Sequence, residues 1–141
     1  MANITAAAVN ELRKRTGVGM MDCKKALVEC DGDMDKAIDY LREKGQKLAA
    51  KRADRDASEG AVLATVNADK TFAAVIMMNC ETDFVAKNED FVAFTREVLQ
   101  TAVDAKAKSL EEVMALTING LSVETMIVEQ VAKIGEKITL S

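Results

Sequence analysis

The side chains that could carry chemistry in this sequence are carboxylates and thiols, because the sequence contains no histidine. Without an imidazole, the Ser-His-Asp and Cys-His mechanisms of nucleophilic catalysis are excluded within these residues. The cysteines are Cys23, Cys30 and Cys80, and no two of them have Cys-x-x-Cys spacing. A zinc site would therefore need unusual ligands, and the pattern favours buried free thiols.

Glu81 and Asp83 are the carboxylates considered for acid–base chemistry, but neither a nucleophile nor a metal-binding framework accompanies them. The sequence also lacks a Gly-rich loop that would cradle a phosphate. A carboxylate-dependent enzyme is thus the weakest interpretation. We expect a protein that acts by binding, with no enzymatic activity, cofactor or metal site of its own.

The segment that invites a binding interpretation is Cys80-Glu81-Thr82-Asp83-Phe84-Val85. It follows an apolar run and precedes an amphipathic helical pattern, and loops in such positions tend to carry function. Two interpretations of Phe84 stay open at this level. Either the ring packs back into its own core, or it is an exposed apolar anchor beside a carboxylate.

The elements around this segment predict an α+β fold with a small antiparallel sheet packed with helices. Residues 61–66 are rich in β-branched side chains, residues 67–70 are a turn of hairpin length, and residues 72–78 form the returning strand. Because the second run is continuously apolar, we expect both faces of that strand to be covered. Asn88 is placed to cap a long amphipathic helix.

The C-terminal part of the sequence predicts two further helices and a strand. A short helix is expected over residues 110–116, and another over residues 123–134, where Gly135 stops it. Residues 137–140 alternate between polar and apolar side chains and predict a strand.

Residues 1–55 predict a three-helix bundle with a helical connector, and residues 56–141 an α+β core subdomain that ends early. Thr5 and Asp33 are placed to cap the first and third helices, and Gly45 is placed to end the third. The basic residues between positions 42 and 55 favour an exposed connector over an RNA-binding patch, since no aromatic side chain interleaves with them.

The charge and hydropathy of the chain also limit its partners. The formal net charge of −4 argues against direct nucleic-acid binding, which rewards an excess of Lys and Arg. Residues 1–8 lack the basic and apolar regions of a signal peptide, and no apolar run is long enough to span a bilayer. We therefore expect a cytoplasmic protein with no membrane contact.

Three runs of the sequence resemble the bacterial elongation factor Ts family: LRKRTGVGMMDCKKAL at residues 12–27, NCETDFVAK at residues 79–87, and VAKIGE at residues 131–136. They occur in the family's order, and the resemblance covers the whole chain. It implies an N-terminal three-helix domain of the ubiquitin-associated type followed by an α/β core. It also implies a partner, the GTPase elongation factor Tu, whose GDP release the family promotes without chemistry of its own.

The resemblance also implies which residues contact the partner. Asp83 and Phe84 are expected to insert between helices of the GTPase near its magnesium and phosphate site, flanked by Thr82 and Val85. Lys24 in the second helix is expected to face the GTPase. The family normally continues past the point where this sequence ends, into a second half of the core. The alternative function is a generic helical protein-binding module of the ubiquitin-associated type, which would use residues 17–21 and the third helix.

Overall fold

The structure is a computed structural model that describes residues 3–141. The chain divides into two compact units, one formed by Met1–Ala53 with Val128–Gly135 and the other by Asp54–Ile127 with Glu136–Ser141. The first unit contains a helical bundle, and the second contains a three-stranded antiparallel sheet packed with helices. The predicted α+β fold class is confirmed, whereas a domain boundary near residue 55 stays a prediction.

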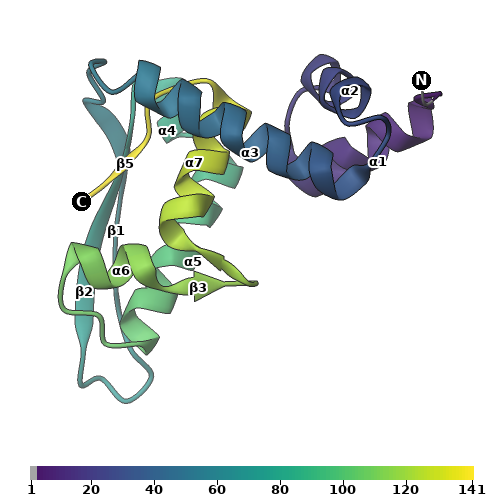
Figure 1. Cartoon of the computed structure of the whole chain (residues 1–141). Coiled ribbons are helices and arrows are strands. Elements are labelled where there is room, and N and C mark those ends of the chain that lie inside the picture. Colours follow the sequence, from purple (N-terminus) through teal and green to yellow (C-terminus); the bar gives the residue numbers. More distant parts are fainter. Residues whose placement is uncertain (1–2) are drawn as a thin grey trace. The chain divides into compact units, whose positions relative to one another are not determined.

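Three helices form the bundle of the first unit, to which residues 128–135 also belong: α1 (Ala6–Thr16), α2 (Met20–Glu29) and α3 (Met34–Lys51) (Figure 1). Thr5 caps α1 by accepting the backbone N–H of Ala8 at 3.1 Å. Asp33 caps α3 by accepting the N–H of Lys36, also at 3.1 Å. Both predicted caps are therefore confirmed. The bundle encloses a small core of buried apolar residues: Val9, Leu12, Val18, Cys23, Ala26, Leu27, Ala37 and Leu41.

The prediction that Gly45 ends the third helix is wrong. Helix α3 continues without interruption to Lys51, and Gly45 lies buried inside it. A Cβ built on Gly45 would lie 3.0 Å from the Cβ of Ala132 and 3.3 Å from the carbonyl oxygen of Val128. The glycine therefore serves the close approach of another helical segment rather than a helix stop.

The sheet of the second unit has the strand order β1-β2-β5. Strands β1 (Glu59–Val66) and β2 (Ala73–Cys80) form the predicted hairpin, whose register runs from Glu59 opposite Cys80 to Val66 opposite Ala73. Strand β5 (Thr139–Leu140) pairs antiparallel with β2 and confirms the predicted last strand. The central strand β2 thus ends, at Cys80, directly before the segment that carries Asp83 and Phe84.

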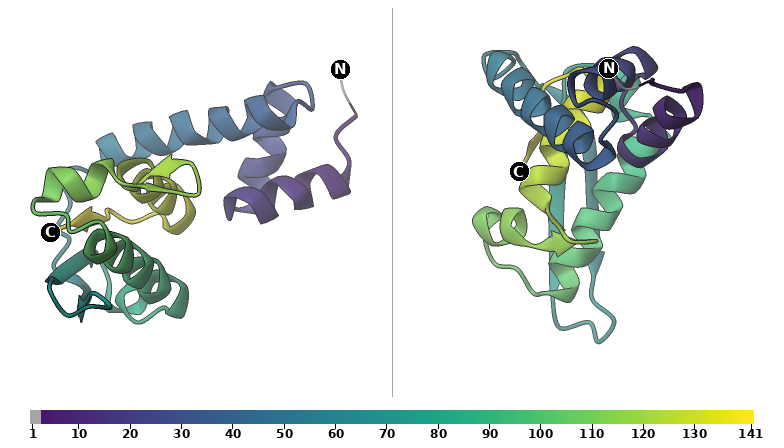
Figure 2. Two further views of the ribbon diagram at one scale, coloured as in Figure 1. Left: turned by 90° about the horizontal axis from the view of Figure 1, so that it is seen from below. Right: turned by 45° about the vertical axis from the view of Figure 1, so that its right-hand side comes forward.

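Only one face of the hairpin is covered within the described residues. Helix α5 (Glu89–Asp104) packs against β1 and β2, and the views in Figures 1 and 2 show it running along one side of the hairpin. On the other face, Val62, Val66 and Val75 are exposed. The prediction that both faces of residues 72–78 are covered is therefore wrong. A continuous apolar run does not distinguish a strand buried on two faces from one with an exposed apolar face.

The remaining elements belong to the second unit, except that residues 128–134 of the last helix belong to the first. Helix α4 (Asp83–Ala86) is a single turn, and α6 (Leu110–Ala115) and α7 (Val123–Ile134) confirm the two predicted helices. Strands β3 (Thr117–Ile118) and β4 (Leu121–Ser122) form a two-stranded hairpin that was not predicted. Its turn residues Asn119 and Gly120 both have positive φ, as the tight hairpin turn requires.

Candidate functional site

The candidate site lies between the end of β2 and the start of α5 and includes the short helix α4. Thr82 has extended backbone, and its hydroxyl accepts the N–H of Val85 at 3.4 Å as the N-cap of α4. Asn88 then caps α5, its side chain accepting the N–H groups of Asp90 and Phe91, as predicted. The segment expected to be an irregular loop is therefore one helical turn held between two caps.

Phe84 projects into solvent from this turn, with 83% of its surface exposed. This exposure excludes the interpretation in which the ring packs into the core of its own unit, whereas its role as a binding anchor stays a prediction. Asp83 is also exposed, and its carboxylate lies 3.5 Å from the ammonium of Lys87. An exposed ion pair of this kind contributes little to stability, so the carboxylate is available for other contacts.

Glu136 anchors the start of this turn. One oxygen of its carboxylate accepts the backbone N–H groups of Glu81 and Thr82, both at 3.0 Å. The other oxygen accepts the Thr82 hydroxyl at 2.8 Å. Thr82 therefore donates its hydroxyl proton to Glu136 while the same oxygen caps α4.

The carboxylate of Glu81 makes the reciprocal contact. One of its oxygens accepts the backbone N–H of Lys137 at 2.8 Å, and the other lies 3.2 Å from the guanidinium of Arg55. Each glutamate thus binds backbone of the segment that carries the other. Residues 81–82 and 136–137 are held together in this way although more than fifty positions separate them in the sequence.

Cys80 packs under the same turn. Its thiol is buried and donates to the carbonyl oxygen of Thr82 at 3.2 Å. Burial, with a smaller contribution from the negative charge of Glu136, raises the pKa of the Cys80 thiol above its ordinary value. The thiol therefore stays protonated and acts as a structural donor, not as a nucleophile.

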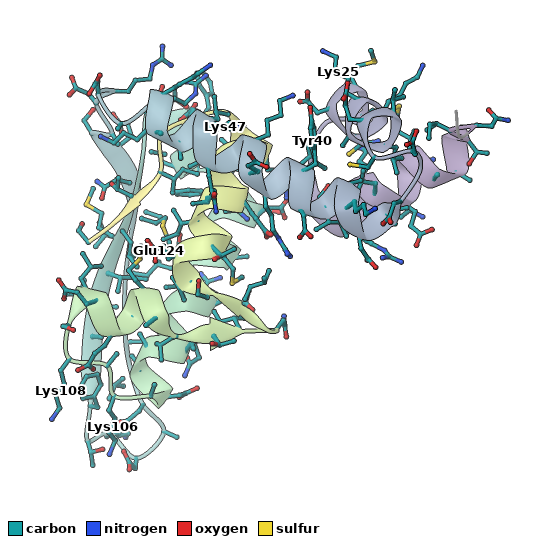
Figure 3. The ribbon with its side chains drawn as sticks, in the orientation of Figure 1. Lys25, Tyr40, Lys47, Lys106, Lys108 and Glu124 are labelled. Carbon is teal, nitrogen blue, oxygen red and sulfur yellow. The ribbon has the colours of Figure 1, made fainter. Side chains whose placement is uncertain are left out.

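Lys24 belongs to the other compact unit. It is exposed on α2, and the neighbouring Lys25 projects from the same helix in Figure 3. The structure brings Thr82, Asp83, Phe84 and Val85 together on one turn of the second unit, and Lys24 belongs to the first unit. Its role toward a partner stays a prediction.

Glu81 and Glu136 were not among the predicted site residues. Both lie inside runs that carry the family resemblance, and Glu136 follows the glycine that ends α7. Their place within these runs is the feature of the sequence that could have pointed to them. The sequence could not show that two segments so far apart exchange backbone hydrogen bonds.

The described residues also bear on metal sites and membrane contact. Residues 3–141 contain no group of three or more Cys, Asp or Glu side chains arranged to hold a metal ion. None of the helices in that range is long and apolar enough to cross a membrane.

Fold and site together define a small α+β protein that presents an exposed aromatic ring beside a carboxylate. A family model described as "Elongation factor TS" matches residues 81–141, and one described as "Elongation factor Ts, mitochondrial, N-terminal" matches residues 1–49. The chain belongs to the elongation factor Ts family.

Curated relatives match the chain almost from end to end. Elongation factor Ts of Christiangramia forsetii is 57% identical over 140 residues, which are 99% of this chain and 50% of that protein. Elongation factor Ts of Rhodopirellula baltica is 54% identical over 141 residues, which are 100% of this chain and 43% of that protein. The chain thus spans about half the length of the curated relatives it matches.

Proposed function

We propose that this chain promotes GDP release from the translation GTPase elongation factor Tu. In this proposal Asp83 and Phe84 insert near the magnesium and phosphate site of the GTPase, and no covalent bond is made or broken by the chain itself. The observation that carries the proposal is the 83% exposure of Phe84 on a helical turn fixed at both ends. Membership of the elongation factor Ts family supports the choice of partner.

An exposed phenylalanine is well suited to this task. Aromatic side chains dominate the energetics of interfaces when they fill a pocket on the partner. Complete burial of such a ring contributes about 1.5–3 kcal/mol. This free energy is enough to shift the conformation of a mobile element of the GTPase. It is too small to displace a tightly held nucleotide, so contacts over a broad interface must supply the remaining free energy.

The coupling between GDP and this chain must be reciprocal. If the chain lowers the affinity of the GTPase for GDP, GDP lowers the affinity of the GTPase for the chain by the same factor. We therefore expect capture of elongation factor Tu by the immobilised chain to weaken when GDP is added. Equal capture with and without GDP would contradict an exchange function.

The decisive experiment measures stopped-flow release of fluorescent GDP from bacterial elongation factor Tu. Phe84→Ala should slow the stimulated release about tenfold to a hundredfold, in line with the loss of a buried ring. Leu110→Ala is the matched control, because Leu110 is another exposed apolar side chain of the same unit. An unchanged release rate with saturating Phe84→Ala protein would exclude a role for the ring.

The predicted role of Lys24 needs its own comparison. If its ammonium faces the GTPase, Lys24→Ala should raise the concentration of factor that gives half-maximal release and leave the rate at saturation nearly unchanged. Lys25→Ala is the control, since Lys25 is the adjacent exposed lysine of α2 (Figure 3). Equal effects of the two substitutions would show only a general dependence on positive charge.

The second candidate function is a generic helical protein-binding module of the ubiquitin-associated type. Met20 and Met21 favour it, because they are 50% and 69% exposed at the start of α2 and flexible methionines suit adaptable contacts. This candidate predicts that Met20→Ser combined with Met21→Ser abolishes partner capture. It also predicts that Phe84→Ala changes neither capture nor GDP release.

A further inference from the structure

We infer that Glu136 is the positioning residue of the Asp83–Phe84 turn, and that Glu81 completes a reciprocal latch with it. The inference deepens the proposed function, on which it rests for the meaning of the turn. The geometry that supports it belongs to one compact unit and consists of four hydrogen bonds between residues 81–82 and 136–137.

The turn needs such an anchor because α4 has little stability of its own. Helix α4 has four residues, none of which is buried. A helix of one turn is unstable alone, because nucleation costs more than its few hydrogen bonds return. Its position therefore depends on its packing and on the residues that lead into it, and Glu136 binds the two residues that directly precede the helix, Glu81 and Thr82.

A glutamate is chemically suited to this position. The ionised carboxylate is an acceptor only, and its two oxygens serve three donors at once: two consecutive backbone N–H groups and the Thr82 hydroxyl. Hydrogen bonds to an ionised acceptor are also stronger than neutral ones. Because the Thr82 hydroxyl is committed to Glu136 as donor, its oxygen is oriented to cap α4 one residue before Asp83.

Glu81 supplies the reciprocal contact of the latch. Its carboxylate accepts the Lys137 N–H, so the residue that follows Glu136 is held by the residue that precedes Thr82. Glu136 accepts three of the four hydrogen bonds, and Glu81 accepts the fourth. We therefore expect loss of Glu136, which carries three of the four hydrogen bonds, to have the larger effect on the turn.

The first test reports on the turn itself and does not depend on a partner. In the full chain, amide hydrogen exchange followed by NMR should show the N–H groups of Glu81 and Thr82 exchanging on the order of tenfold faster in Glu136→Ala, since a bond to a charged acceptor is lost. Glu136→Gln keeps one acceptor oxygen for the N–H groups and should restore most of the protection. Glu124→Ala, an exposed glutamate on α7, should leave both amides unchanged (Figure 3).

The second test separates positioning from general stability with a double-mutant cycle in GDP release. Glu136→Ala should slow the stimulated release, and Glu136→Gln should slow it less. Because Glu136 acts through Phe84, Glu136→Ala should have almost no further effect on the release rate when Phe84 is already alanine. A residue that merely stabilises the fold would reduce release by the same factor in both backgrounds.

The outcomes distinguish the inference from the proposed function. Unchanged protection of Glu81 and Thr82 in Glu136→Ala overturns the latch, whatever the release rates are. Additive effects of Glu136→Ala and Phe84→Ala on release overturn the positioning role. If Phe84→Ala alone leaves release unchanged, the proposed function fails, and the amide-exchange result still decides whether Glu136 orders the turn.

Discussion

Gly45 of α3 and Ala132 of α7 lie so close that a Cβ on the glycine would be 3.0 Å from the Cβ of the alanine. Glycine inside a helix costs about 1 kcal/mol relative to alanine, so its presence in the middle of an 18-residue helix requires a compensating gain. The gain is the close packing of two helical segments within the first unit.

We predict that Gly45→Leu destabilises the chain by about 1–3 kcal/mol, the usual cost of overpacking a tight contact. The urea unfolding midpoint measures this loss. Gly19→Ala is the control, because no atom outside the adjacent residues lies within 4 Å of a Cβ built on Gly19. If Gly45→Leu were as stable as the unsubstituted chain, the close approach of Ala132 would be wrong.

The two faces of β2 should differ sharply in their tolerance of a hydroxyl group. Val75 is 65% exposed and its neighbour Ile76 is 7% exposed. Val75→Thr keeps the β-branched shape on an open face and should change the free energy of unfolding by less than about 0.5 kcal/mol. Ile76→Thr removes the buried Cδ1 methyl, puts a hydroxyl in place of the Cγ1 methylene, and should cost about 2–4 kcal/mol. If the two substitutions lowered the free energy of unfolding equally, the face of the sheet that carries Val75 would be covered in solution.

Local signals in the sequence predicted much of this fold. Thr5, Asp33 and Asn88 each bind backbone N–H groups two or three positions ahead, so the sequence around each residue contains the whole interaction. The hairpin of β1 and β2 was predicted for the same reason. The hairpin of β3 and β4 could also have been predicted, because Asn119-Gly120 is a strong signal for a two-residue turn.

Sequence patterns could not predict the contacts between segments that lie far apart in the chain. Gly45 looked like a helix stop because the helical segment that packs against it lies more than eighty positions later in the chain. For the same reason, no sequence pattern indicated that Glu81 and Glu136 each bind backbone of a distant segment. Phe84 was identified as a candidate because its apolar ring stood in a polar segment, but only the structure showed that the ring stays outside the core.

The carboxylate of Asp83 should act on the magnesium ion of the partner GTPase if the proposed function is correct. Asp83→Asn removes the charge and keeps the shape, and we predict GDP release about tenfold slower at millimolar magnesium, the effect of losing one interaction with a charged group. In excess EDTA the difference should disappear, because no magnesium remains to be displaced. Glu111→Gln, an exposed acid of α6, is the control. A deficit that persists in EDTA would assign Asp83 a different role.

The buried thiol of Cys80 should make stability depend on pH in the alkaline range. Burial raises its pKa above the ordinary value of 9.0, so the folded chain keeps a proton that the unfolded chain loses. The stabilisation is fully present below the unfolded pKa and declines as pH rises through that value toward the folded pKa. The decline cannot exceed about 1.4 kcal/mol per pH unit for one thiol.

Urea unfolding midpoints at pH 7.5 and pH 9.5 test this prediction. Cys80→Ala should be less stable than the unsubstituted chain at pH 7.5, because the donor to Thr82 and the packing of the sulfur are lost. It should also lose less stability between the two pH values, since only the cysteine carries the titrating group. Cys30→Ala is the comparison, because Cys30 is only half-buried and its smaller desolvation should give a weaker effect. If the unsubstituted chain and Cys80→Ala declined equally, the alkaline loss would come from other groups and the Cys80 thiol would not hold its proton through burial.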